Sequence, residues 1–201
     1  MSTDSHNTTV TRGHGLLEGF LSRMRANKAN SLIPDELRSG AVLDIGCGSF
    51  PFFLSNTKFA QKFAIDQLPP SVADEHITWH VRNLNETPSL PFKDGKLSVI
   101  TLLAVAEHIH PDSLAAILKE AHRVLKPGGR VILTTPAGWT DGLLKFMARV
   151  GLVSSEEIDE HVIGYTKALL AAQLSGAGFA ADKFKVGTFE LGVNLWAMAE
   201  R

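Results

Sequence analysis

The chain has 201 residues, of which 44% are apolar and 20% are charged, and its 20 basic and 21 acidic residues give a formal net charge of −1. This length and composition suit one globular domain with a full core. The balanced charge excludes the strongly basic surface that binds a nucleic-acid backbone, so we expect a small-molecule partner and no nucleic acid.

The N-terminal segment is polar, and no uninterrupted apolar stretch reaches the length of about 18 residues that a membrane span needs. We therefore expect no signal peptide, no membrane span and a disordered segment over residues 1–13. The single cysteine, Cys47, cannot form an internal disulfide, which is typical of a reducing, cytoplasmic compartment. The sequence does not indicate an oligomeric state.

The first predicted element is an amphipathic helix over residues 14–29, which ends before Pro34. Its apolar face comprises Leu16, Leu17, Phe20, Leu21 and Met24, and the basic residues of its other face are Arg23, Arg25 and Lys28.

Short apolar or β-branched runs then predict strands at residues 41–45, 62–66, 77–81, 97–105 and 130–135. A short helix is predicted within residues 49–58, whereas 67–76 and 83–96 are predicted to be mostly loop. A longer helix begins at Asp112 and is closed by Pro127-Gly128-Gly129; its buried face comprises Leu114, Ile117, Leu118, Ala121 and Leu125. Continuously apolar strands that alternate with helices predict a parallel sheet covered on both faces.

After the fifth strand, helices are predicted within residues 139–151 and 166–179. Leu143, Leu144, Met147 and Val150 share one face of the first of these, which either packs in the core or lines an apolar pocket. Residues 181–187 and 192–200 resemble a terminal pair of strands, which we expect to be antiparallel to each other at one edge of the sheet.

The segment "AVLDIGCGSFPFFL" places Asp44 and two glycines directly after the first predicted strand. A dinucleotide-binding loop has the pattern G-x-G-x-x-G, but Pro51 stands at its third glycine position and Asp44 would repel a pyrophosphate. A carboxylate favours a cationic ligand, such as a sulfonium or an ammonium, while glycine backbone can hydrogen-bond an amino-acid portion. Asp66, at the end of the second strand, can accept hydrogen bonds from both ribose hydroxyls. S-adenosylmethionine is a ligand of this kind.

The sequence contains four segments in a fixed order and spacing: "VLDIGCG", which is part of the segment above, "AID", "RNLNETPSLPFKDGKLSVITLLAVAEHI" and "HRVLKPGGRVILTTP". Together they resemble a class I S-adenosylmethionine-dependent methyltransferase of the small-molecule, ubiquinone-biosynthesis-like kind. The resemblance implies a Rossmann-like α/β fold with a mainly parallel seven-stranded sheet, an antiparallel edge strand and helices on both faces. It implies transfer of a methyl group from S-adenosyl-L-methionine but does not specify the acceptor. The amphipathic stretches at 14–29 and 139–150, expected at or near the carboxyl ends of the strands, predict a cover over a small, partly apolar acceptor.

We also expect a division of the chain. Residues 14–201 would form a single methyltransferase domain. Within it, 14–37 would be an N-terminal helical cover, 38–137 the cofactor-binding core, and 138–201 an acceptor-side insert with the C-terminal strand pair. If the first helix covers the site, deletion of residues 1–29 is expected to reduce methyl transfer more than cofactor binding.

Matched position by position, the resemblance places Asp44, Gly46, Cys47 and Gly48 around the methionine portion of the cofactor. It places Asp66 at the ribose with Gln67 beside it, and Ala104 and Glu107 on the methionine side. Asn83 and Leu84 would lie beside the adenine, although Asn83 stands where the family commonly has Asp. The segment "SFP" after Gly48 also departs from the usual small residues.

Methyl transfer from a sulfonium needs alignment and exclusion of water more than it needs a base. His108 could act as a base, as a structural or positioning residue, or as a metal ligand, and we predict no metal site. His161 and Tyr165, which precede the late helix, are the other polar candidates, while a buried tyrosine with one hydrogen bond is the favoured interpretation of Tyr165.

Two other functions were weighed against methyl transfer. A non-catalytic scaffold or regulatory protein that retains the S-adenosylmethionine site stays open. An NAD-dependent oxidoreductase is disfavoured by Asp44, by Pro51 and by the "LKPGG" segment. The sequence leaves open the identity of the acceptor and whether oxygen, nitrogen or carbon is methylated.

Overall fold

The computed structural model describes residues 18–140 and 164–201. Its centre is a seven-stranded sheet with the order β3-β2-β1-β4-β5-β7-β6. The strands are β1 (Ala41–Ile45), β2 (Gln61–Asp66), β3 (Ile77–Val81), β4 (Leu97–Leu103), β5 (Leu125–Pro136), β6 (Phe184–Phe189) and β7 (Asn194–Glu200). This order confirms the predicted α/β fold.

The first five strands pair in parallel, and β7 runs antiparallel to both of its neighbours, β5 and β6. The predicted antiparallel pair at one edge is thus confirmed. The reversed strand is β7, which lies between β5 and the edge strand β6. The edge strand β6 therefore runs in the same direction as the parallel strands.

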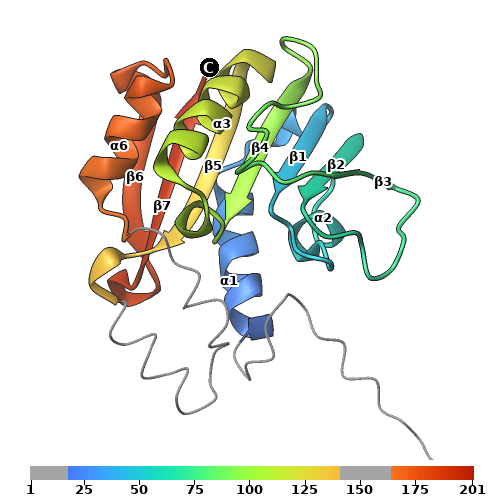
Figure 1. Ribbon diagram of the computed structural model, residues 1–201, viewed down its shortest axis with the longest axis horizontal. Helices are drawn as coiled ribbons and strands as arrows, with labels where there is room; N and C mark the ends of the chain where they lie inside the picture. The colour runs from blue at the N-terminus through green and yellow to red at the C-terminus, as the bar shows by residue number, and fades with distance from the viewer. Residues whose placement is uncertain (1–17, 141–163) are drawn as a thin grey trace, which may run out of the picture.

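Helices cover both faces of the sheet (Figure 1). One face carries α3 (Pro111–Val124) and α6 (Lys167–Gly176), and the other carries α1 (Glu18–Ser31) and the single turn α2 (Phe52–Ser55). Short 3-10 turns connect the elements: η1 (Asp35–Leu37), η2 (Ala106–His108), η3 (Gly138–Thr140), η4 (Ala181–Lys183) and η5 (Glu190–Gly192). Each face therefore has its own hydrophobic core.

The ends of several strands differ from the sequence prediction, among them those of β4 and β5. β4 stops at Leu103 because Ala104 takes a left-handed conformation, with φ at 55°, that extended strand excludes. β5 begins at Leu125, earlier than the predicted 130, and its pairing with β4 shifts register between Leu97 and Val99. The "KPGG" segment, expected to be a turn, therefore lies inside the strand as an irregularity.

The apolar face predicted for the first helix is not the face that packs on the sheet. Phe20 is 58% exposed, whereas Ser22, Ala26 and Ala29 are buried. Small side chains let the helix approach the sheet closely. The prediction followed the large apolar residues and therefore missed this face of small residues. Lys28, assigned to the solvated face, instead lies 4.2 Å from the ring centroid of Trp196.

Three predicted features lie partly or wholly outside the described residues. They are the disordered segment over 1–13, the first residues of the N-terminal helix, and the helix within 139–151 from residue 141 on. Among the residues that the structure does describe, no helix is both long and apolar enough to cross a membrane. The division of the chain into a cover, a core and an insert stays a prediction.

Candidate functional site

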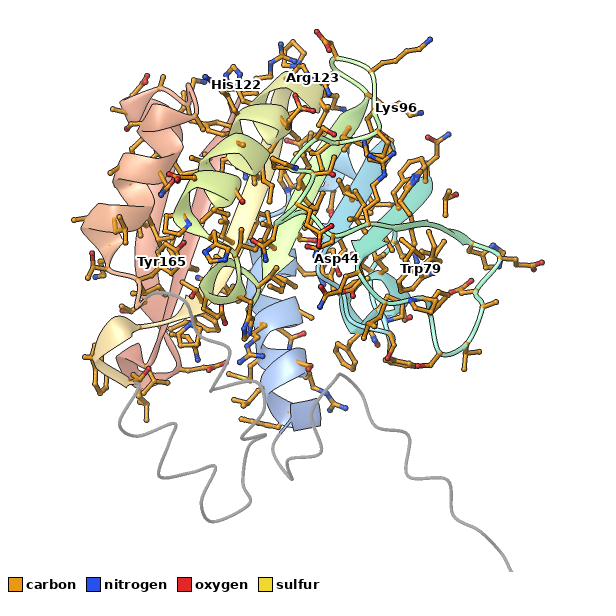
Figure 2. All side chains as sticks on the ribbon, viewed as in Figure 1. Asp44, Trp79, Lys96, His122, Arg123 and Tyr165 are labelled. Atoms are coloured by element: carbon orange, nitrogen blue, oxygen red, sulfur yellow. The ribbon has the colours of Figure 1, made fainter. Side chains whose placement is uncertain are left out.

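The candidate site lies where the chain order of the sheet reverses. β1 pairs with β2 on one side and with β4 on the other, so the carboxyl ends of these three strands meet at one edge. Open α/β sheets bind ligands in the crevice outside this point. Figure 2 shows Asp44 and Tyr165 toward this end of the sheet, whereas Lys96, His122 and Arg123 lie toward the opposite end.

The loop after β1 depends on two glycines in left-handed conformation. Gly46 has φ at 69° and Gly48 has φ at 67°, values that side-chain-bearing residues adopt only at a cost. A Cβ on Gly46 would lie 2.5 Å from a methyl carbon of Val105, so the segment after β4 packs directly on this glycine. A Cβ on Gly48 would meet no described heavy atom within 4 Å. Gly48 is itself buried and its N–H donates to Asp66, but the space on its Cα side is clear of described atoms.

Asp66 holds this loop in place. Its carboxylate accepts a hydrogen bond from the Gly48 N–H at 2.9 Å and another from the Leu68 N–H at 2.9 Å. The side chain is buried at the end of β2. An ionised carboxylate accepts hydrogen bonds at both of its oxygens, which is the chemistry that hydroxyl groups of a ligand require.

Asp44 is a second buried carboxyl in the same region. It is 3% exposed, and the Thr101 hydroxyl donates to its Oδ1 at 2.6 Å. Burial raises the pKa of Asp44 to about 7, and the negative charge of Asp66 adds to this effect while the Thr101 hydrogen bond opposes it. A cation next to this pair would favour the ionised form, which agrees with the cationic ligand expected from the sequence.

The other predicted cofactor residues surround this loop with different degrees of burial. Cys47 is partly buried and Gln67 is exposed. Asn83 accepts a hydrogen bond from the Asn85 N–H at 3.0 Å and donates to Glu86 at 2.9 Å, while Leu84 belongs to the core. The Arg82 N–H donates to the Asp66 carbonyl at 2.8 Å, which sets this turn beside the end of β2.

Ala104 and Glu107 begin the segment that follows β4. The Ala104 N–H donates to the Thr134 carbonyl at 2.8 Å, which fixes the left-handed residue against β5. A strained backbone that its surroundings enforce is common at functional sites. Glu107 is buried in η2, and its charge helps to raise the pKa of Tyr165.

His108, His161 and Tyr165 are the predicted catalytic candidates. His108 is partly buried in η2, and its carbonyl accepts a hydrogen bond from Asn85 at 3.2 Å. His161 lies outside the described residues. Tyr165 is 1% exposed, and its backbone forms an isolated parallel β-bridge with Ala137. Its hydroxyl has no hydrogen-bond partner among the residues that the structure describes. The structure thus brings Tyr165 to the Glu107 side of the site.

Tyr165 cannot serve as a base near neutral pH. Burial, with a further contribution from the charge of Glu107, raises its pKa to about 12. The phenol therefore stays protonated and is suited to donate a hydrogen bond. Within the described residues, no group of three or more His, Cys, Asp or Glu side chains is arranged to hold a metal ion.

Sequence reasoning missed two residues that organise the site. Thr101 lies in the apolar run of β4, and only the pairing of β4 with β1 places its hydroxyl on Asp44. Asn85 joins the loop after β3 to the start of α3, since its side chain accepts from the His110 N–H at 3.0 Å and its carbonyl from Ser113 at 3.1 Å. A polar residue inside an apolar strand was the available signal for Thr101. Asn85 had no local signal, because its partners His108, His110 and Ser113 lie 23 to 28 positions later in the chain.

Comparison with protein families gives a match over most of the chain. The family model described as "Methyltransferase domain" matches residues 17–183. This range contains the glycine loop, both buried aspartates and Tyr165.

Two curated relatives are ubiquinone biosynthesis O-methyltransferases. The protein of Pseudomonas paraeruginosa is 30% identical over 110 residues, which are 49% of this chain and 45% of that protein. The protein of Xanthomonas oryzae pv. oryzae is 29% identical over 110 residues, or 50% of this chain and 44% of that protein. The matched segment thus spans less than half the length of these relatives.

Solved structures share the fold at low sequence identity. The S-adenosylmethionine-dependent methyltransferase of Mesorhizobium loti has a TM-score of 0.64 and 16% identity, covering 87% of this chain and 96% of that one. A S-adenosylmethionine-dependent methyltransferase of Archaeoglobus fulgidus has a TM-score of 0.63 and 13% identity, covering 90% and 94%. At these identities the likeness establishes the architecture of the sheet and its helices.

Proposed function

Because the chain belongs to the methyltransferase domain family, within the class I S-adenosylmethionine-dependent methyltransferases, we propose that it transfers a methyl group from S-adenosylmethionine to a small, partly apolar acceptor. The observation that carries this proposal is the pair of buried, electrostatically coupled carboxyls, Asp44 and Asp66, the second of which holds the glycine loop through the Gly48 N–H. This arrangement suits a ligand with a positive charge and a ribose, and it does not suit a pyrophosphate.

The residues present fit the cofactor in three respects. The open side of Gly48 leaves room for the ligand to approach the backbone, and Gly46 keeps the loop in the required conformation. Asp66 presents a carboxylate, the group that suits the hydroxyls of a ribose, and Asp44 supplies negative charge for the cationic portion. Asn83 would accept from the adenine amine with the second lone pair of its Oδ1.

The bound cofactor supplies a methyl group on positively charged sulfur, a donor that needs no further activation. The protein's share of the reaction is to align the acceptor and to exclude water. Tyr165 and Glu107, both buried beyond the carboxyl end of β4 and β5, would orient a polar atom of the acceptor. His108 and His161 stay the candidates for a base, a role that this reaction does not require.

A partly apolar acceptor is supported by exposed large apolar side chains near the carboxyl end of the sheet. Trp139 is 68% exposed in η3, and Leu191 is fully exposed in η5. These two turns are neighbours, because the Ala137 N–H donates to the Val193 carbonyl at 2.9 Å. Phe20, near the start of α1, is also exposed. Such side chains favour contact with an apolar ligand surface over contact with water.

The first test is titration calorimetry with S-adenosylmethionine, S-adenosylhomocysteine and NAD. Binding of S-adenosylmethionine and S-adenosylhomocysteine with little binding of NAD is expected. A comparable affinity for NAD would contradict the proposal. Asp66→Ala should weaken cofactor binding at least about tenfold, since it removes charge-assisted hydrogen bonds. Asp74→Ala is the matched control, because Asp74 forms the same type of turn, with the His76 N–H at 2.9 Å, away from the site.

The second test is transfer of a labelled methyl group to a panel of small hydroxyl and amine acceptors. Product formation with at least one acceptor is expected. Tight cofactor binding without transfer to any member of the panel would favour the scaffold function instead.

A further inference from the structure

The side chain of Asn85 joins two segments that reach the candidate site from different strands. Asn85 follows β3, in the loop that also contains Asn83 on the adenine side of the site. Its carboxamide donates to the His108 carbonyl at 3.2 Å and accepts from the His110 N–H at 3.0 Å. Both partners belong to the segment after β4, which contains Glu107 on the methionine side. One side chain therefore connects the two sides of the site.

An amide is the chemical group that this contact requires. The two backbone partners flank Ile109, and one of them needs a donor while the other needs an acceptor. A carboxamide offers both from one planar group. An ionised aspartate has the same shape but only accepts, so one of its oxygens would face the His108 carbonyl oxygen. The Ser113 hydroxyl, in the first turn of α3, also donates to the Asn85 carbonyl at 3.1 Å.

The segment after β4 is fixed without the help of Asn85. At its start, the Ala104 N–H donates to the Thr134 carbonyl of β5 at 2.8 Å. At its end, helix α3 packs in the core through the fully buried Leu114. The loop after β3 is less well packed, and residues 85–87 are exposed. The segment after β4 is therefore the fixed part, and the loop is the part that Asn85 positions.

The orientation of Asn83 within the loop does not depend on the Asn85 carboxamide. The backbone N–H of Asn85 donates to Oδ1 of Asn83 at 3.0 Å, and Nδ2 of Asn83 donates to Glu86 at 2.9 Å. Loss of the carboxamide would leave these two contacts in place. It would remove only the side-chain tie between the loop and the segment that contains Glu107.

We infer that Asn85 is a positioning residue that holds the adenine side of the site at a fixed separation from the methionine side, and this inference rests on the proposed function. S-adenosylhomocysteine occupies both sides, so it gains affinity when their separation is set before binding. Adenosine occupies the adenine and ribose side alone and gains little. The ratio of the two affinities therefore reports the role of Asn85.

The inference can be tested by calorimetry with S-adenosylhomocysteine and with adenosine. Asn85→Asp and Asn85→Ala are each expected to weaken binding of S-adenosylhomocysteine about three- to tenfold, and binding of adenosine less than about twofold, because they remove one or two hydrogen bonds. Asn85→Asp keeps the size of the side chain and adds a negative charge near the start of α3, which favours a helix. It therefore remains informative if Asn85→Ala perturbs folding.

Asn30→Ala is the matched control. Oδ1 of Asn30, on α1, accepts from Arg38 at 3.1 Å and from Thr57 at 2.8 Å, on the face of the sheet opposite α3. This variant should lower the melting temperature and leave the ratio of affinities unchanged. An unchanged ratio in the Asn85 variants, an equal loss of both ligands, or the same change of ratio in Asn30→Ala would overturn the inference.

The wild-type protein separates the two proposals. If it binds S-adenosylhomocysteine and the Asn85 variants keep the wild-type ratio, the positioning role alone is contradicted. Failure of the wild-type protein to bind S-adenosylhomocysteine contradicts the proposed function and, with it, the inference that rests on it.

Discussion

Asp44 combines a structural cost with a functional use. Its pKa of about 7 in the folded protein, compared with an ordinary value of 3.8, arises first from burial and then from the charge of Asp66. The folded state therefore holds this proton more tightly than the unfolded state. The contribution of Asp44 to stability is present below about pH 4 and is lost as the pH rises to about 7, a loss of roughly 4 kcal/mol. A cationic ligand offsets this cost by stabilising the ionised carboxylate.

The affinity for S-adenosylmethionine should consequently depend on pH. Between pH 8 and pH 6 the ionised fraction of a group with a pKa of about 7 falls about tenfold, so binding should weaken by up to about tenfold. Titration calorimetry at several pH values measures this, and buffers of different ionisation enthalpy report the proton released. The Asp44→Asn variant is the control and should show a much flatter profile. An equally steep profile in that variant would assign the pH dependence to another group.

Helix α1 shows how packing can depend on small residues. Ala26 and Ala29 are almost fully buried against the sheet, whereas the larger Phe20 is exposed. The helix contacts the same core that contains Val42 and Ile132 of β1 and β5. Close approach of a helix to a sheet leaves little space for a longer side chain at the contact, since protein interiors are packed at high density.

Ala26→Leu should therefore destabilise the protein, although it adds apolar surface. Overpacking of a filled core costs about 1 to 3 kcal/mol, and the free energy of unfolding from urea denaturation should fall by that amount. Phe20→Ala is the control, because an exposed side chain is expected to change stability by only about 0.5 kcal/mol or less. If Phe20→Ala lowers the free energy of unfolding more than Ala26→Leu does, the face of α1 predicted from the sequence is the one that packs on the sheet.

This contrast explains which elements the sequence predicts well. Strands β1 to β5 and helix α3 were found because long apolar runs and a strong helical period report burial on their own. The buried face of α1 and the early start of β5 depend on tertiary contacts, which no local pattern records. In the site, Asp44, Gly46, Gly48 and Asp66 follow from their places at strand ends. The Thr101–Asp44 hydrogen bond required the register of β4 against β1.

At the scale of the whole molecule, the sheet separates two hydrophobic cores. Each core combines residues from segments that are far apart in the sequence. The face under α1 and α2 contains residues of β1, β2, β3, β4, β5 and β7. The opposite face packs under α3 and α6. Arg130, near the bend of β5, donates to the Leu32 carbonyl at 2.8 Å and so ties the segment after α1 to the far end of the sheet. Helix α1 thus covers one core through Ala26 and Ala29 in its second half.

Deletion of residues 1–29 should therefore unfold the domain, which revises the expectation that the first helix serves mainly as a cover. The deletion removes Ala26 and Ala29 from the core and exposes apolar side chains such as Val42 and Ile132 to water. A domain of this size has a free energy of unfolding of only about 5 to 15 kcal/mol. Loss of the helix that covers one core is therefore expected to abolish cooperative unfolding. Thermal melting followed by circular dichroism measures this, with the full chain as the reference. A truncated protein that melts cooperatively and binds S-adenosylhomocysteine normally, yet has lost only methyl transfer, would show that the helix acts as a cover after all.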